Sequence, residues 1–243
     1  MSARDFSRQR GILDPANIVH PVHVIGCGGI GSATVLGLAC MGFTKFHLWD
    51  GDRVEEPNIP TQLLWHDGCI GVNKARVLGA ILRRKLEGDG EVVAHECMFD
   101  PTLHSHLLDG IVVVGVDSME AVPGRPCGRK ELWERAIRFN PKVVLLLDGR
   151  LGGEHLELFT VRPWHDSDVA AYENENVLFS QQRMSQAPCA QGAIIYVAQI
   201  IGGLIARQIA RFCNDERAPL RVGLNLSSLE FFLEEPNQEG DAS

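Results

Sequence analysis

The chain has 243 residues, of which 45% are hydrophobic and 22% charged, and its formal net charge is −8. This length and balance predict a soluble globular protein with one large domain or two small ones. The negative charge argues against general binding to nucleic acid or to anionic membranes, because such binding favours a basic face.

Targeting signals and cysteine usage restrict the compartment. The first residues, MSARDFSRQR, lack the apolar core of a signal peptide. The most apolar run, GAIIYVAQIIGGLIA, is too short to span a bilayer and contains Gln199. Seven cysteines without a CxxC pair indicate a reducing compartment and give no support to a four-cysteine zinc site. We therefore expect a cytoplasmic protein that does not cross a membrane.

Strand and helix patterns alternate along the chain, which predicts βαβ units and a mostly parallel sheet. The first strand is VHVIG, a helix follows over 28–41, and KFHLWD is the second strand. The helix NKARVLGAILRRKL precedes a third strand, EVVAHEC, and GIVVVGVD is a fourth strand that ends in an acid. A helix containing RKELWERAIRF leads to a fifth strand, KVVLLLDGR, with HLELFTV as its antiparallel neighbour.

The C-terminal part begins with a polar, aperiodic segment over 162–188, and a segment of this length is typical of lids and binding loops. We interpret it as a segment that crosses over a nucleotide site. A helix over 190–212 follows, and LRVGLNLSSLEFFLE is interpreted as a closing hairpin. The predicted fold class is α/β, with a Rossmann-like, mostly parallel sheet flanked by helices and extended by antiparallel strands. We expect one domain over 1–235 and a disordered acidic tail over 236–243.

The junction between the first strand and the first helix has the spacing G-x-G-x-x-G, formed by Gly26, Gly28 and Gly31. Such a turn lets backbone N–H groups meet a phosphate at the positive end of a helix. Asp50 ends the second strand, where it can bind a ribose. These features predict a nucleotide site; the alternative is glycines that only allow the helix to pack on the strand.

Two kinds of nucleotide site fit this junction. A NAD-dependent oxidoreductase would use Asp50 for the ribose, but it also needs a substrate domain, for which we find no convincing segment. An ATP site would use several acids and a lysine around phosphates and a metal. Asp52, Glu55 and Glu56 follow Asp50 closely, which favours the ATP site.

Five further segments carry a resemblance: FSRQRGIL, VIGCGGIGS, DGDRVEEPNIPTQ, GVNKA and VDSMEA. Their order and approximate spacing resemble the ThiF/MoeB/HesA superfamily, the adenylyltransferases related to ubiquitin-activating enzymes. The resemblance covers most of 6–160 and the segment CAQGAIIYVAQIIGG. It implies ATP-dependent adenylation of a carboxylate with release of pyrophosphate. The implied substrate is the C-terminus of a small ubiquitin-like or sulfur-carrier protein, or a peptide.

The resemblance also implies site residues. Asp50 would hold the ATP ribose, Lys74 would contact the phosphates, and Asp117 would hold Mg²⁺. The rest of the nucleotide-binding set would be Gly26, Gly28, Gly29, Gly31, Asp52, Asn58 and Gln62. A lysine and a metal would stabilise the departing pyrophosphate, and Mg²⁺ in proteins usually has one or two carboxylate ligands plus phosphate oxygens. Each residue alone has a simpler reading, Lys74 as a solvated lysine and Asp117 as a helix N-cap.

Two positions depart from the family pattern. The family usually has N-x-x-R-Q where this chain has Asn58 to Gln62, so Thr61 replaces a phosphate-contacting arginine. The family also commonly has an arginine soon after the acid of the fourth strand, and here an insertion containing VPGRPCG displaces it to Arg129. We interpret the insertion as a surface loop. The missing charge at Thr61 leaves a nucleotide-binding regulatory or scaffold protein as an alternative function.

Two more residues are candidates by resemblance. Cys189 lies in the region of the sequence where some family members have a cysteine that takes the activated carboxylate as a thioester. A nearby helix N-terminus would favour the thiolate of Cys189. A small buried residue is the alternative. Arg8, in FSRQ, resembles the arginine of the family's YxRQ, which reaches into the partner's ATP site in homodimers. We therefore expect a homodimer in which Arg8 acts in trans, with a frayed terminal arm as the alternative.

Overall fold

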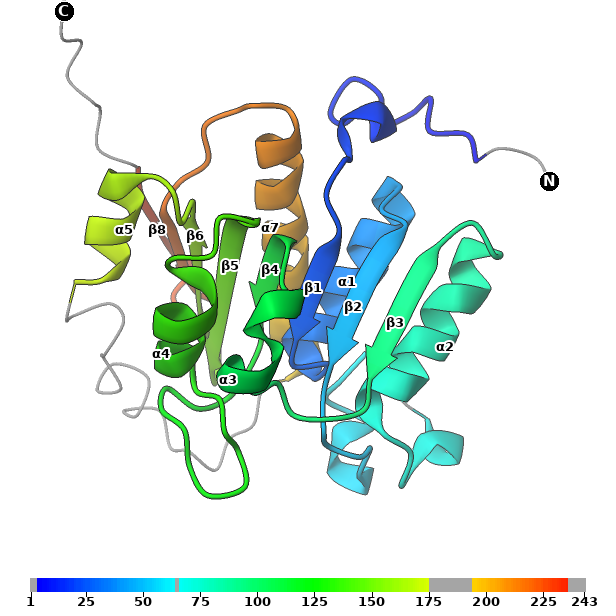
Figure 1. Ribbon diagram of the computed structural model, residues 1–243. Coiled ribbons are helices and arrows are strands. Elements are labelled where there is room, and N and C mark those ends of the chain that lie inside the picture. The colour runs from blue at the N-terminus through cyan, green and yellow to red at the C-terminus, as the bar shows by residue number, and fades with distance from the viewer. Residues whose placement is uncertain (1–3, 64–65, 175–193, 236–243) are drawn as a thin grey trace, which may run out of the picture.

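The computed structural model describes residues 4–63, 66–174 and 194–235, which form an eight-stranded sheet with helices packed on it (Figure 1). The strands are β1 Val22–Ile25, β2 Lys45–Trp49, β3 Glu91–His95, β4 Gly110–Val114, β5 Val143–Gly152, β6 His155–Val161, β7 Arg221–Asn225 and β8 Glu230–Glu234. The helices are α1 Gly29–Met41, α2 Lys74–Leu86, α3 Pro101–His104, α4 Arg129–Leu132, α5 Asp166–Tyr172 and α7 Ile195–Cys213.

The strand order is β3-β2-β1-β4-β5-β6-β7-β8. Strands β1 to β5 run parallel, and β6, β7 and β8 extend the sheet antiparallel. This confirms the predicted α/β, Rossmann-like class. In the register, Ile25 at the end of β1 lies between Trp49 at the end of β2 and Val114 at the end of β4. The carboxyl ends of these strands therefore meet beside the point where the strand order reverses, which is where open α/β sheets bind ligands.

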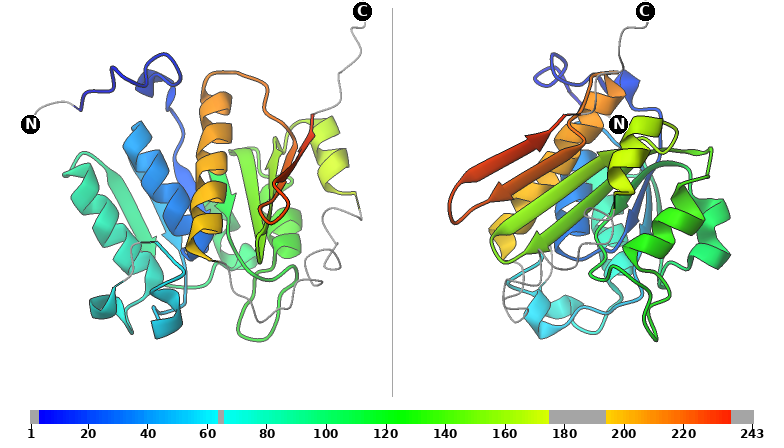
Figure 2. Two further views of the ribbon diagram at one scale, coloured as in Figure 1. Left: turned by 180° about the vertical axis from the view of Figure 1, so that it is seen from behind. Right: turned by 90° about the vertical axis from the view of Figure 1, so that its left-hand side faces the viewer.

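Side-chain alternation divides the core between the two faces of the sheet. Val22 and Val24 of β1 pack into the cluster formed with α1, α2 and α7, whereas Ile25 packs into the cluster formed with the other face. Figure 2 shows α1, α2 and α7 together on one side of the sheet, and α3, α4 and α5 lie on the other. Among the helices of the described ranges, none is both long and apolar enough to cross a membrane.

The polar segment over 162–188 contains more order than its sequence predicted, because α5 lies within it. The indole of Trp164 donates a hydrogen bond to the Val144 carbonyl at the start of β5 (3.2 Å), and the buried Tyr172 packs into the core. Seven residues are too few for a clear helical period, and the helix is stabilised by this packing. The remainder, over which the predicted crossing of the nucleotide site would occur, lies outside the described residues, as does the tail over 236–243.

Candidate nucleotide-binding site

The turn between β1 and α1 follows a path that requires glycine. Gly26 has a φ of +96°, and a Cβ there would lie 2.7 Å from the Gly115 carbonyl oxygen. A Cβ at Gly31 would lie 2.1 Å from the Gly26 carbonyl oxygen, so the helix can begin directly under the turn only without that atom. Gly28, the N-cap of α1, has no side chain to cover the first N–H groups. The positive end of α1 is therefore open to an anion.

Asp50 lies beside this turn, directly after β2, and is only 8% exposed. Its carboxylate accepts hydrogen bonds from the backbone N–H groups of Cys27 (2.7 Å) and Asp52 (2.8 Å). Burial raises the pKa of Asp50, although these two hydrogen bonds oppose the rise. Each carboxylate oxygen has a further lone pair, so Asp50 can fix the turn and still accept a hydroxyl donor such as a ribose.

Asn73 connects Asp50 to the start of α2. Its side-chain nitrogen donates to the Asp50 carbonyl oxygen (2.8 Å), and its side-chain oxygen accepts from the N–H of Arg76 (3.0 Å), which caps the helix. Lys74, the first residue of α2, is 9% exposed, and its Nζ lies 3.8 Å from Asp52 Oδ2. Asn73 was not among the predicted site residues, although an Asn directly before a helix is a common N-cap.

The segment after Asp52 turns back over the glycine turn. The Gln62 side chain lies 3.7 Å from the position of a Cβ on Gly28, and the Thr61 carbonyl oxygen lies 3.9 Å from that of a Cβ on Gly29. Asn58 uses its side-chain oxygen locally, accepting the N–H of Glu55 (3.0 Å). The structure thus brings Gln62 and Thr61 to the glycine turn, whereas the side-chain oxygen of Asn58 stabilises its own turn.

Charged side chains gather at the carboxyl ends of β2 and β4. Asp117 follows β4 with its side chain 92% exposed, and its Oδ2 lies 3.7 Å from Nη1 of Arg125. The other nitrogen of that guanidinium, Nη2, lies 3.5 Å from Asp52 Oδ2. Two acids, Asp52 and Asp117, therefore lie together with two cations, Lys74 and Arg125. Arg125 was not predicted, because a single charged residue in an insertion gives no signal of the direction in which it points.

The insertion forms a loop that is mostly exposed over 122–126, as expected, but Cys127, Gly128 and the following Arg129 are buried. The guanidinium of Arg129 donates to the Asp148 carboxylate and to the Val116 carbonyl. Asp148 also accepts from Arg150 (2.9 and 2.7 Å) and from the Tyr172 hydroxyl (3.0 Å). Burial raises the pKa of Asp148, but Arg129 and Arg150 outweigh it and hold the pKa below its usual value. This network fixes the backbone just before Asp117.

Arg8 is not brought to this site of its own chain. Arg8 is exposed, and the adjacent Gln9 donates to the carbonyl of Met41, the last residue of α1 (2.7 Å). A helix of this length extends about 20 Å, so Arg8, next to Gln9, lies near the end of α1 opposite the glycine turn of its own chain. Figure 1 shows the N-terminal segment at that end of the molecule. Cys189 lies outside the described residues. Cys27 is fully buried, and burial raises the pKa of its thiol, which suits a packing role.

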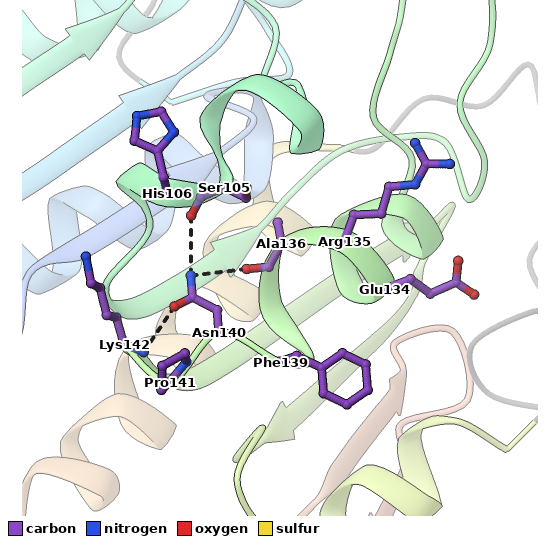
Figure 3. A pocket seen from close by; sticks show the side chains of 9 residues that line it. All are labelled: Ser105, His106, Glu134, Arg135, Ala136, Phe139, Asn140, Pro141 and Lys142. Carbon is purple, nitrogen blue, oxygen red and sulfur yellow. Dashed lines mark hydrogen bonds between the residues drawn. The ribbon is translucent and has the colours of Figure 1, made fainter.

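A cavity of about 380 Å³ lies elsewhere, beside the amino-terminal ends of β4 and β5. Figure 3 shows Asn140 in its lining, donating to the carbonyls of Ser105 (3.3 Å) and Ala136 (3.3 Å) and accepting from the N–H of Lys142 (3.0 Å). The amide therefore stabilises the surrounding backbone. The cavity is separate from the nucleotide-binding residues.

Comparisons with known proteins agree with this geometry. The model of the ThiF family matches residues 19–239. The NEDD8-activating enzyme E1 catalytic subunit of Arabidopsis thaliana is 29% identical over 147 residues, which is 59% of this chain and 32% of that protein. The adenylyltransferase and sulfurtransferase MOCS3 of Mus musculus is 36% identical over 132 residues, which is 51% of this chain and 28% of that protein. The chain thus spans less than a third of the length of these relatives.

Among solved structures, E. coli MccB with AMPCPP and MccA has a TM-score of 0.69 at 18% identity. The alignment covers 96% of this chain and 68% of that one. E. coli MccB with ATP gives the same TM-score and identity, covering 92% of this chain and 66% of that one. At this identity the likeness establishes a shared fold.

Proposed function

The chain belongs to the ThiF family, and from this membership we propose that it uses ATP to adenylate a carboxylate and releases pyrophosphate. One observation carries the proposal: Asp50, Lys74 and the open N-terminus of α1 meet at the carboxyl ends of β1 and β2. The names of the relatives, an activating enzyme and an adenylyltransferase, support the same chemistry. The neighbour MccB was crystallised with ATP, which supports the choice of nucleotide.

The reaction assigns a task to each residue. An oxygen of the carboxylate attacks the α-phosphorus of ATP, a new P–O bond forms, and the bond to the oxygen that bridges the α- and β-phosphates breaks. Pyrophosphate leaves with the electron pair of that bond, and the acyl-adenylate remains. Asp50 accepts a ribose hydroxyl. The N–H groups at the start of α1 bind phosphate oxygens, and Lys74 stabilises the negative charge that grows on the leaving group.

Asp117 is the proposed ligand of Mg²⁺, and the carboxylate of Asp52 lies nearby, across the Arg125 side chain. Both supply the hard oxygen ligands that Mg²⁺ prefers. Within the described ranges, no group of three or more His, Cys, Asp or Glu side chains could hold a metal ion. This fits an ion that takes its other ligands from water and nucleotide phosphates. When bound, the ion neutralises phosphate charge.

The proposed carboxylate is the C-terminus of a small ubiquitin-like or sulfur-carrier protein, or of a peptide. The names of the relatives, which include a NEDD8-activating enzyme and a sulfurtransferase, support this choice. We further propose a cytoplasmic homodimer in which Arg8, distant from its own site, serves the site of the partner. Cys189 is proposed to attack the carbonyl carbon of the acyl-adenylate, so that a thioester forms, the bond from that carbon to the phosphate oxygen breaks and AMP leaves.

Exchange of labelled pyrophosphate into ATP tests the proposed reaction. The purified chain is assayed with candidate carriers and, as a matched control, with the same carriers bearing a C-terminal amide in place of the carboxylate. We expect exchange only with the free carboxylate. The uncharged Thr61 makes a regulatory nucleotide-binding protein the second candidate, and ATP binding without exchange for any carrier would support it. Binding of NAD without ATP would contradict adenylation and support an oxidoreductase.

A further inference from the structure

The loop between β4 and α4 folds back on itself as a tight hairpin. Val122 and Arg125 exchange two backbone hydrogen bonds, of 3.0 and 2.8 Å. Between them, Pro123 and Gly124 occupy the central positions of the turn, and Gly124 has a φ of +81°. Proline followed by a residue with positive φ is the signature of a type II turn. The sequence VPGR therefore sets the position of the Arg125 backbone.

The base of this hairpin is fixed to α4. Glu131 Oε2 accepts hydrogen bonds from the N–H groups of Ala121 (3.0 Å) and Gly128 (3.1 Å), which lie on opposite limbs of the loop. A Cβ at Gly128 would lie 2.4 Å from the Glu120 backbone, so the limbs approach this closely only because the residue is glycine. The backbone N–H of Arg129 also donates to the Ser118 carbonyl (3.2 Å). These contacts hold the two limbs of the loop together and fix the position of its tip.

The tip places a guanidinium among the charged groups of the nucleotide site. Arg125 lies 3.5 Å from a carboxylate oxygen of Asp52 and 3.7 Å from one of Asp117, and its side chain is 43% exposed. The Asp52 oxygen that faces Arg125 also faces Lys74 at 3.8 Å. Long, partly exposed ion pairs of this kind contribute little to folding stability. Stabilisation of the fold therefore does not account for a loop built to hold this side chain here.

A polyphosphate would make better use of the same guanidinium. Planar guanidinium groups bind phosphate oxygens in pairs, through hydrogen bonds that are shorter than the contacts of 3.5 and 3.7 Å between Arg125 and the two acids. Thr61, which lies beside the glycine turn together with Gln62, carries no charge, and its hydroxyl donates to the Pro57 carbonyl (3.0 Å). Lys74 and Arg125 are thus the cations that flank Asp52.

We propose that Arg125 binds the two phosphates of ATP that leave as pyrophosphate. Asp52 and Asp117 hold the guanidinium in place before the nucleotide arrives, and Arg125 then exchanges these long contacts for phosphate oxygens. The inference rests on the proposed adenylation function. It makes the inserted hairpin a phosphate-binding element of this chain.

The test compares the wild type with Arg125→Ala, Arg125→Lys and the control Arg135→Ala. Arg135 is exposed and lines the cavity beside the amino-terminal ends of β4 and β5, so its replacement removes the same charge at a distance from the site. ATP and AMP affinities are measured by equilibrium titration, together with pyrophosphate exchange and thermal unfolding. We expect Arg125→Ala to weaken ATP binding by at least about 10-fold, and AMP binding by less than about 3-fold, because AMP lacks the departing phosphates. Arg125→Lys should recover part of the loss, and Arg135→Ala should match the wild type.

Three results for Arg125→Ala would overturn the inference: unchanged ATP affinity, tighter ATP binding, or a parallel loss of ATP and AMP binding with a lowered melting temperature. The first result would mean that Arg125 does not contact the phosphates. The second would mean that its side chain blocks the empty site, and the third that it stabilises the fold. A wild type that binds ATP without exchange contradicts adenylation alone, since the ATP-to-AMP affinity ratio still decides the role of Arg125. A wild type that does not bind ATP overturns both proposals.

Discussion

Replacing Lys74 with alanine should separate catalysis from folding. Lys74 is the first residue of α2, and its Nζ lies 3.8 Å from Asp52 Oδ2. The substitution removes one positive charge from the proposed position of the phosphates. It leaves the backbone hydrogen bond from the N–H of Lys74 to the Asp52 carbonyl (2.9 Å) intact, as well as the Asn73 cap.

The structure gives the two magnitudes to compare. The Lys74 side chain is 11% exposed, so its charge acts in a largely desolvated position. At an effective dielectric constant near 20, unit charges about 4 Å apart interact by about 4 kcal/mol, and loss of one such transition-state contact typically lowers a rate by about 100- to 1000-fold. The ion pair with Asp52, whose side chain is 37% exposed, contributes about 1 kcal/mol or less to folding. Activity should therefore fall much more than stability.

Pyrophosphate exchange with a saturating carrier measures the first quantity, and urea unfolding followed by circular dichroism measures the second. Lys85→Ala is the matched control, because Lys85 is an exposed lysine in the last turn of the same helix. We expect Lys74→Ala to lose about 100-fold in exchange rate and Lys85→Ala to behave as wild type. If Lys74→Ala instead kept more than about a third of the wild-type rate, Lys74 would not stabilise the departing phosphates.

Three other predictions address the turn, the buried histidine and the dimer. Gly31→Ala should lower the free energy of unfolding in urea by about 3 kcal/mol, because its Cβ would overlap the Gly26 carbonyl. Gly37→Ala on the same helix has room for a Cβ and should raise that free energy by up to about 1 kcal/mol; equal effects would refute the reasoning. Burial lowers the pKa of His23 from 6.5 to about 4, so the folded state disfavours its protonation. Stability should fall as pH drops from 6.5 toward 4, by about 2 kcal/mol at pH 5, and His23→Asn should flatten this dependence in urea titrations. Mixing inactive Arg8→Ala and Asp117→Ala homodimers should restore about a quarter of wild-type exchange, since about half the dimers are mixed and each has one complete site. No recovery after verified subunit exchange would mean that Arg8 does not act in trans.

Periodicity was sufficient to predict the parallel part of the sheet. Strands such as β4, GIVVV, are continuous apolar runs because both faces of the sheet are covered, and glycine and acidic residues mark their ends. The antiparallel pair β5 and β6 was also predictable, since a glycine turn separates two apolar runs. The short helix α5 was not predictable, because packing of Val169 and Tyr172 stabilises it and the local sequence is polar.

The candidate site divides along the same line. Gly26, Gly31 and Asp50 were predictable because strand–turn–helix geometry restricts what can occupy those positions. The burial of Arg129 was not, since it depends on Asp148, a residue of the next strand that gave no local signal. The residues near the strand ends could be predicted from their positions along the chain. The pairing of their charges could be known only from the folded structure.

The acids that follow β2 acquire a physical role in this arrangement. The buried Asp50 holds the glycine turn through the N–H of Cys27 and also accepts the N–H of Asp52, whereas the Asp52 carboxylate lies beside Lys74 and Arg125. Without a ligand, Lys74 and Arg125 would repel each other across that space, and two acids in contact with them offset the repulsion. If this site binds the polyphosphate of ATP as proposed, the ligand meets cations that the acids already hold in position, through long contacts that are easily exchanged. On this proposal, the acidic residues beside the site orient the cations that bind an acidic ligand.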